Sequence, residues 1–203
     1  MMAEQDAQPG GEAALDEDSK TVKETPSGKE KPKGKRFDSL DLPDDVVSSL
    51  KEMGISHCTP IQEKVIDPIL AGGDIIGKAE TGTGKTIGFG APLVARIDTQ
   101  RVAVQGIVLT PTRELAQQVA EVVEALGKGR ELRVVLLVGG VHASGQIAKL
   151  RKGSQLVVGT PGRVLDLLKE RILSLGWCEN CLLYTSDAAD EGLGVDLGGR
   201  RII

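Results

Sequence analysis

The stretch from Gly77 to Thr86, Gly-Lys-Ala-Glu-Thr-Gly-Thr-Gly-Lys-Thr, carries the clearest chemistry in the sequence. Its glycines allow main-chain amides to curl around phosphate oxygens, and the helix expected to begin here adds partial positive charge. Lys85 is suited to reach the terminal phosphates of a nucleotide, and the Thr86 hydroxyl is suited to ligate Mg²⁺. Ala79 stands where the strict pattern has glycine, so the match is to a variant of this phosphate loop. The alternative is a glycine-rich turn without a ligand, which the Gly-Lys-Thr ending disfavours.

The elements that could position this loop follow from the hydrophobic pattern. After Phe37, short apolar runs alternate with amphipathic stretches. This alternation implies parallel strands joined by right-handed crossovers, so we predict an α/β fold with a doubly wound, mostly parallel sheet. In such sheets ligands bind beyond the carboxyl ends of the strands. The expected strands are Asp74–Gly77, Val104–Leu109, Arg133–Val138 and Gln155–Val158, and the expected helices are Asp44–Met53, Thr59–Leu70, Lys85–Ile97, Arg113–Leu126, Ser144–Arg151 and Gly162–Glu170.

Several short motifs, in a consistent order, resemble those of the DEAD-box ATP-dependent RNA helicases. Ala79 to Thr86 resembles the family's phosphate loop, and Gly54 to Gln62 resembles its adenine-recognition motif. An isolated aromatic residue, Phe37, lies seventeen positions before Gly54, as the family pattern expects. The resemblance covers about residues 37–179. It implies a RecA-like P-loop NTPase domain that uses ATP and Mg²⁺ in RNA-stimulated ATP hydrolysis coupled to local RNA unwinding.

The chemistry of Gln62 agrees with the role that the resemblance implies. A glutamine amide can pair bidentately with the N6 and N7 edge of adenine, which would select ATP over GTP. The ring of Phe37 could stack on the base, although packing as a small cap on the following helix is the alternative. Thr59 and Pro60 form a helix start in either case. The predicted ATP-binding residues are Phe37, Thr59, Gln62, Ala79, Glu80, Thr81, Gly82, Thr83, Gly84, Lys85 and Thr86, with Thr86 also the predicted Mg²⁺ ligand.

Three further motifs lie where strands are expected to end. Pro111 to Ala116 and Thr160 to Arg163 resemble the family's two RNA-contact motifs, and Gly139-Gly140 resembles its glycine pair. At such positions main-chain amides can bind a phosphate. Contacts of this kind bind the RNA backbone and have little sequence preference. Ordinary turn chemistry is the alternative, and Arg113 could instead brace the domain. The predicted RNA-binding residues are Pro111, Thr112, Arg113, Gly139, Gly140, Thr160, Pro161, Gly162 and Arg163.

The resemblance ends near Glu179. The family next has a strand ending in Asp-Glu-Ala-Asp, whose first Asp holds Mg²⁺ and whose Glu orients the attacking water. Here Asp187 to Asp190 arrives late and has Ala188 in place of the glutamate, so no catalytic residue is assigned. We interpret residues 180–203 as foreign to the family, with a divergent natural tail as the alternative. The predicted ATP-binding domain is therefore 37–179, incomplete at its C-terminal end.

Composition limits the remaining choices. A chain of 203 residues suits one domain with a core, and its net charge of −4 provides no general attraction for nucleic acid. RNA binding would therefore depend on a local groove. No stretch is long and apolar enough to suggest a membrane span, and the N-terminus has no signal-peptide pattern. Three cysteines suggest no disulfide framework, and Cys178 and Cys181 lack the further ligands of a zinc site, so we expect a reducing, cytoplasmic location.

Residues 1–36 form a charged arm that we predict to be disordered. The arm is acidic from Glu4 to Asp18 and basic from Lys29 to Arg36. Weak contact between the basic half and RNA phosphates is the alternative.

Two other function classes stay open from the sequence. Another P-loop ATPase, such as a DNA translocase, would share the phosphate loop, but Gln62 and the motif from Thr160 to Arg163 argue against it. A non-catalytic fragment that binds nucleotide or RNA belongs to a different class. Nucleotide binding without turnover would favour this class. Without the catalytic acids and a second domain, the chain itself is expected to be unable to unwind RNA.

Overall fold

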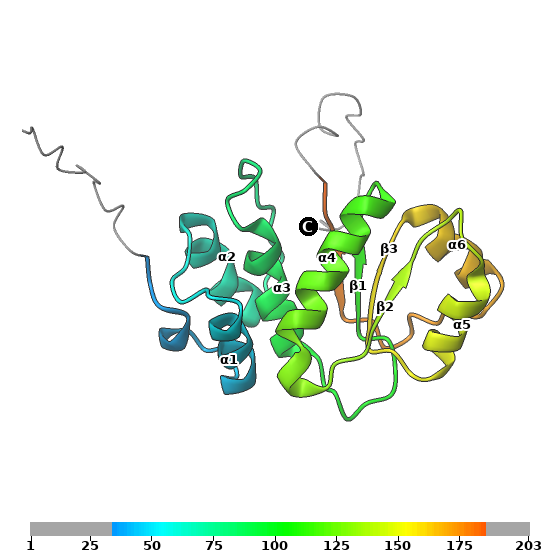
Figure 1. Cartoon of the computed structure of the whole chain (residues 1–203), viewed down its shortest axis with the longest axis horizontal. Helices are drawn as coiled ribbons and strands as arrows, with labels where there is room; N and C mark the ends of the chain where they lie inside the picture. The colour runs from blue at the N-terminus through cyan, green and yellow to red at the C-terminus, as the bar shows by residue number, and fades with distance from the viewer. Residues whose placement is uncertain (1–33, 186–203) are drawn as a thin grey trace, which may run out of the picture. The chain divides into compact units, whose positions relative to one another are not determined.

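A four-stranded parallel sheet forms the centre of the computed structural model, which describes residues 34–185 (Figure 1). Its strands are β1 (Gly106–Leu109), β2 (Val134–Leu137), β3 (Leu156–Gly159) and β4 (Asn180–Leu183). The strand order is β2-β3-β1-β4, and every pair is parallel. The predicted α/β fold with a parallel sheet is therefore confirmed. The expectations for residues 1–33 and 186–203, including Asp187 to Asp190, lie outside the described residues.

Helices cover both faces of this sheet. Figure 1 shows α4 on one side of the strands and α5 and α6 on the other. Among the described residues, no helix is both long enough and apolar enough to cross a membrane. The helices are α1 (Asp44–Glu52), α2 (Pro60–Leu70), α3 (Lys85–Arg96), α4 (Arg113–Leu126), α5 (Ala143–Arg151) and α6 (Pro161–Lys169), with short 3-10 helices η1 (Phe37–Ser39) and η2 (Lys128–Arg130).

The two faces of the sheet bury two separate apolar clusters. In β2, Val134 joins the cluster that also holds α1, α3 and α4, whereas Val135 joins the cluster beneath α6. In β3, Val158 and Val157 divide in the same way. This alternation is the period of two expected of a strand that is covered on both faces. Apolar packing therefore stabilises both faces of the sheet. Because all four strands are parallel, their carboxyl ends lie at the same edge.

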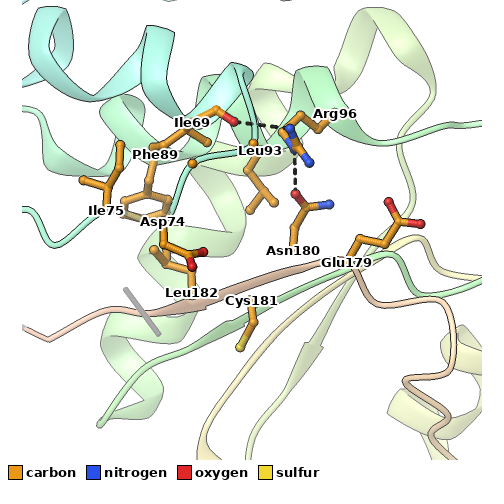
Figure 2. Close-up of a pocket in the computed structure, with 12 residues that line it drawn as sticks. Ile69, Asp74, Ile75, Phe89, Leu93, Arg96, Glu179, Asn180, Cys181 and Leu182 are labelled. Atoms are coloured by element: carbon orange, nitrogen blue, oxygen red, sulfur yellow. Dashed lines mark hydrogen bonds between the residues drawn. The ribbon is translucent and has the colours of Figure 1, made fainter. Parts of the chain in front are cut away.

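The predicted strand Asp74–Gly77 is wrong. The structure has no strand between α2 and α3, and Ile76 is 74% exposed. Main-chain groups of a strand need a neighbouring strand, and no described strand pairs with the outer edge of β4. The chain at Asp74 faces that edge across a cavity of about 210 Å³ (Figure 2). Because the segment lies across this cavity from β4 and does not pair with it, the predicted strand does not form.

Arg96 joins the two walls of this cavity at one end. Its Nε donates to Asn180 Oδ1 at 2.8 Å, and its Nη1 donates to Ile69 O at 3.3 Å (Figure 2). β4 therefore has a defined place beside β1, although it lies within the segment 180–203 that is predicted to be foreign to the domain. The domain boundary at Glu179 stays a prediction.

Candidate functional site

The phosphate loop lies between α2 and the first residue of α3. Gly82 and Gly84 both have positive φ, 77° and 84° respectively, which turns the chain tightly into the helix. Lys85 is the first residue of α3, and its Nζ donates to Ala79 O across the loop. Thr83 Oγ1 donates to Glu80 O at 2.7 Å. The predicted residues thus form one closed loop at a helix N-terminus, the arrangement that suits a phosphate.

Gln62 and Thr59 connect this loop to α2. Thr59 and Gln62 form a capping box, in which Gln62 Oε1 accepts from Thr59 N at 2.8 Å. Gln62 Nε2 donates to Gly84 O at 3.0 Å, and Thr59 Oγ1 donates to Thr83 O at 2.8 Å. The structure therefore brings together two predicted groups, the adenine-recognition motif and the phosphate loop, that are more than twenty residues apart.

The Gln62 side chain is almost fully enclosed, with 2% of the residue exposed. An amide has two donor hydrogens and two acceptor lone pairs, so Gln62 keeps capacity for one further bond at each end. Its present partners are main-chain atoms of its own domain. Gln62 is thus a structural link between helix and loop, whatever further contact it makes to a base.

Gly84 must be glycine for two reasons. Its φ of 84° disfavours any other residue, and a Cβ at this position would collide with Gln62 Nε2. The close approach of the loop to Gln62 therefore depends on the missing side chain.

Phe37 lies in the core in this structure. Only 1% of the residue is exposed, and it belongs to the apolar cluster that contains α1 and α3. Its N–H donates to Ser56 O at 3.2 Å, which fixes η1 beside the segment before α2. This is the packing role that the sequence leaves as the alternative for Phe37. Stacking of the Phe37 ring on a base, which would require the ring to leave this position, stays a prediction.

A cavity of about 340 Å³ adjoins the phosphate loop. Lys78, Ala79 and Lys85 line one side, and Leu182 to Thr185 line the other. Thr86, the predicted Mg²⁺ ligand, is the second residue of α3 and is half-buried. Within residues 34–185, no group of three or more His, Cys, Asp or Glu side chains is placed to hold a metal ion. Of the predicted Mg²⁺ site, the described residues therefore include the Thr86 hydroxyl but no carboxylate cluster.

A second candidate site lies at the carboxyl ends of β1, β2 and β3. The three loops that follow these strands line one open depression. The depression contains Arg113 and Arg163 together with the carboxylates of Glu114 and Asp166. Seven of the nine predicted RNA-binding residues line it, namely Pro111, Thr112, Arg113, Gly139, Thr160, Gly162 and Arg163.

Local contacts fix each of these loops. Thr112 caps α4 by accepting from Leu115 N at 3.2 Å, and Thr110 Oγ1 donates to Thr112 O at 3.0 Å. The Arg113 guanidinium lies against Gly140, whose φ is 73°. Pro161 is exposed at the first position of α6 but does not line the depression. All three predicted motifs therefore converge on one surface.

One residue of this surface is not predicted from the sequence. Gln146 on α5 contacts both the chain after β2 and Arg163. In the sequence it resembles any polar residue of an amphipathic helix, such as the exposed Gln117 of α4. No motif or spacing in the sequence distinguishes it.

The three cysteines are free thiols. Burial raises the pKa of the Cys58 thiol from 9.0 to about 11, with smaller contributions from the charges of Glu63 and Asp67. Burial likewise raises the pKa of Cys178 to about 11 and raises that of Cys181. Such thiols are protonated at neutral pH, and metal ligation or thiol exchange requires the thiolate.

Known proteins resemble this chain over most of its described length. The family model for DEAD/DEAH box helicases matches residues 59–194. The DEAD-box ATP-dependent RNA helicase CshA of Bacillus cereus is 45% identical over 159 residues, which cover 78% of this chain and 30% of that protein. The ATP-dependent RNA helicase CshA of Listeria monocytogenes is 44% identical over 160 residues, which cover 79% of this chain and 30% of that protein.

A solved structure shows the same fold. The crystal structure of a DEAD box protein from the hyperthermophile Methanococcus jannaschii superposes with a TM-score of 0.69 at 37% identity. The superposition covers 73% of this chain and 40% of that one. The chain thus spans 30% of the length of the curated relatives named above.

Proposed function

The chain belongs to the DEAD/DEAH box helicase family, and on this premise we propose that it is the ATP-binding and RNA-binding domain of an ATP-dependent RNA helicase. The observation that carries the proposal is the link from Gln62 to Gly84. This hydrogen bond joins a residue suited to recognise a base to a loop suited to hold phosphates. A nucleotide bound there would engage both at once. The free cysteines support a reducing compartment such as the cytoplasm.

In this proposal the nucleotide phosphates occupy the loop from Ala79 to Thr86. Main-chain amides of the loop and the start of α3 would bind the phosphate oxygens. Lys85 would exchange its bond to Ala79 O for a contact with the terminal phosphates. Gln62 would use its remaining hydrogen-bonding capacity to pair with adenine.

Mg²⁺ would be shared between the nucleotide and Thr86. In phosphate sites this ion takes one or two protein ligands and several phosphate or water oxygens. The Thr86 hydroxyl fits one such position, and the described residues provide no carboxylate cluster for a second. Mg²⁺ would neutralise phosphate charge when bound, while Lys85 and the loop amides orient the phosphates.

RNA would bind across the depression formed by the loops after β1, β2 and β3. Arg113 and Arg163 would contact phosphates, and the N-termini of α4 and α6 would add main-chain donors. Glu114 and Asp166 lie in the same depression. Their charge would weaken the attraction, so we expect modest affinity that falls as salt increases.

Nucleotide binding by the chain tests the first half of this proposal. The measurement is displacement of a fluorescent ATP analogue by ATP or GTP in the presence of Mg²⁺. We expect ATP to compete better than GTP, Lys85→Ala to abolish binding, and Gln62→Ala to remove the preference for ATP. Gln117→Ala, on the exposed face of α4, is the matched control. Equal competition by ATP and GTP in the unmodified chain would contradict the role of Gln62.

A further inference from the structure

The Gln146 side chain holds the point at which β2 ends. Gln146 is half-buried in the second turn of α5. Its Oε1 accepts from Val138 N at 3.2 Å, and its Nε2 donates to Val138 O at 3.0 Å. Val138 directly follows β2. The amide therefore satisfies both main-chain groups of the residue that leads into Gly139-Gly140, as a neighbouring strand would.

The same amide also holds Arg163. Arg163 Nη1 donates to Gln146 Oε1 at 3.2 Å, and Arg163 Nη2 donates to Val141 O at 3.0 Å. The loop between β2 and α5 is thus held before its glycine pair at Val138 and after it at Val141. Gln146 and Arg163 together join the loops that follow β2 and β3.

Few apolar contacts fix α5 independently of this network. None of its residues is fully buried, and its contribution to the core comes from the partly buried side chains Ile147 and Leu150. The neighbouring helix α6, by contrast, buries Val164 and Leu167. Polar contacts therefore contribute a larger share of the positioning of α5 than of α6.

We propose that Gln146 is a positioning residue for RNA: it sets the glycine-pair loop and the Arg163 guanidinium in the relative arrangement that receives an RNA phosphate. The proposal rests on the proposed function, since it concerns the same depression. Gln146 acts through Val138 and Arg163 and need not touch RNA. An uncharged amide supplies both the donor for Val138 O and the acceptors for Val138 N and Arg163, whereas a carboxylate lacks the donor and an ammonium group lacks the acceptors. Asparagine has the same groups but is one methylene shorter.

The test compares single and double variants of the full chain in binding fluorescein-labelled single-stranded oligouridine, measured by fluorescence anisotropy at fixed low salt. The variants are Gln146→Met, Arg163→Ala, their combination, and Gln117→Met, on the exposed face of α4, as the control. We expect Gln146→Met to raise Kd about tenfold, the size of one or two lost hydrogen bonds. We expect the loss in the double variant to be smaller than the product of the two single losses, because the two residues share the contact between Arg163 Nη1 and Gln146 Oε1.

Amide hydrogen exchange provides a readout that does not involve RNA. In Gln146→Met the amide of Val138 should exchange faster than in the unmodified chain, while the amides of α4 remain unchanged. Gln146→Leu replaces the methionine variant if that one does not fold.

Three results would overturn the proposal. Gln146→Met could bind RNA as tightly as the unmodified chain, the losses of the two single variants could multiply in the double variant, or exchange at Val138 could stay unchanged. Failure of the proposed function looks different. In that case Arg163→Ala has no effect on RNA binding, or the unmodified chain does not bind the oligonucleotide, whatever the exchange at Val138 shows.

Discussion

Replacing Gly84 by alanine changes the phosphate loop at the residue that precedes α3. The left-handed conformation costs an alanine about 1–2 kcal/mol, and its Cβ would displace Gln62 Nε2. We expect Gly84→Ala to lower the free energy of unfolding by about 1–3 kcal/mol and to weaken ATP binding. Urea denaturation followed by circular dichroism measures the first effect.

Gly145→Ala is the matched control for this variant. Gly145 lies in α5, and a Cβ there would meet no heavy atom within 4 Å. Alanine is the better helix former by up to about 1 kcal/mol, so the control should be unchanged or slightly more stable. Equal losses in the two variants would mean that neither the φ of Gly84 nor its contact with Gln62 matters for folding.

Cys58 should make folding stability depend on alkaline pH. Burial raises its pKa from 9.0 to about 11, so the folded protein keeps a proton that the unfolded chain loses in this range. Stability is therefore complete below pH 9 and falls as the pH rises towards 11. Urea midpoints between pH 8 and pH 11 measure the effect. Cys58→Ala should show a shallower fall, and parallel curves for the two proteins would contradict this account.

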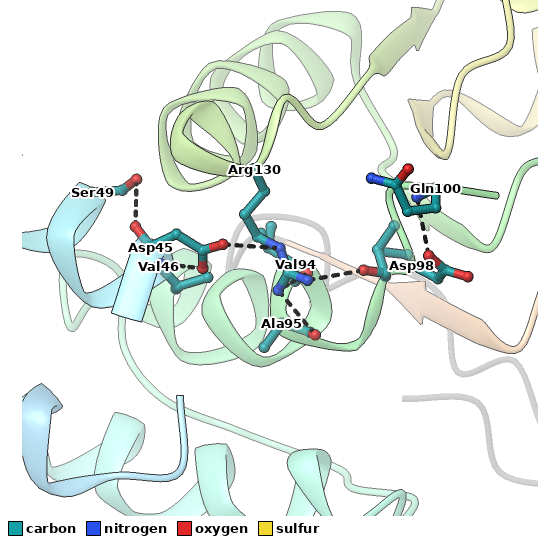
Figure 3. A network of polar contacts seen from close by, with 9 residues as sticks. Asp45, Val46, Ser49, Val94, Ala95, Asp98, Gln100 and Arg130 are labelled. Carbon is teal, nitrogen blue, oxygen red and sulfur yellow. Dashed lines mark hydrogen bonds and ion pairs between the residues drawn. The ribbon is translucent and has the colours of Figure 1, made fainter. Parts of the chain in front are cut away.

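At the scale of the elements, Arg130 holds the end of α3 in place (Figure 3). Its guanidinium donates to Ala95 O at 3.1 Å and to Val94 O and Ile97 O at 3.3 Å, and its Nε lies 3.6 Å from Asp45 Oδ2 on α1. A cation at a helix C-terminus is favourable, and bonds from a charged donor are stronger than neutral ones. One partly buried side chain thereby ties η2 to α1 and α3.

Arg130→Met should lower the free energy of unfolding by about 2–3 kcal/mol, since the methionine keeps an apolar stem but leaves three carbonyls without this donor. Lys128→Met is the control, because Lys128 pairs with Glu52 at the surface, where an ion pair contributes less than about 1 kcal/mol. The side chain of Arg130 is 16% exposed and that of Lys128 is 75% exposed. Similar losses in the two variants, measured by urea denaturation, would show that burial of Arg130 does not strengthen its bonds.

The elements also show what a sequence pattern can and cannot predict. α2 could be predicted because Thr59, Pro60 and Gln62 form a local start signal that depends on no distant residue. Local sequence could not establish whether Asp74–Gly77 forms a strand, because a strand depends on a partner elsewhere in the chain. Its apolar residues indicate a capacity for pairing, and the described sheet ends at β4.

At the scale of the whole molecule, the convergence of the three predicted RNA-contact motifs followed from a general rule. Parallel strands place their carboxyl ends at one edge, so motifs that follow β1, β2 and β3 had to meet. The burial of Phe37 and the role of Gln146 had no such rule. Both depend on contacts between separate segments of the chain, and a local pattern of residues does not predict such contacts.

The isolated chain should not unwind RNA. Phosphoryl transfer requires a positioned water and compensating charge on the terminal phosphate, and the sequence offers no Asp-Glu-Ala-Asp motif to provide them. A strand-displacement assay with a fluorescent RNA duplex, ATP and Mg²⁺ should therefore give the same trace as a sample without protein. A full-length relative such as the Bacillus cereus helicase is the positive control. Displacement by this chain that depends on ATP would show that its sequence contains a complete catalytic site.

The edge of β4 that faces the cavity in Figure 2 also affects how the protein behaves in solution. Within residues 34–185 no strand pairs with this edge, and unpaired strand amides and carbonyls are a template on which another chain can add a strand. Cys181 and Leu183, both exposed on β4, give such an added strand apolar side chains to pack against. We therefore expect self-association that increases with protein concentration and incubation time. In practice, purified samples would scatter more light as they are concentrated, and a soluble peptide that caps this edge would keep them clear.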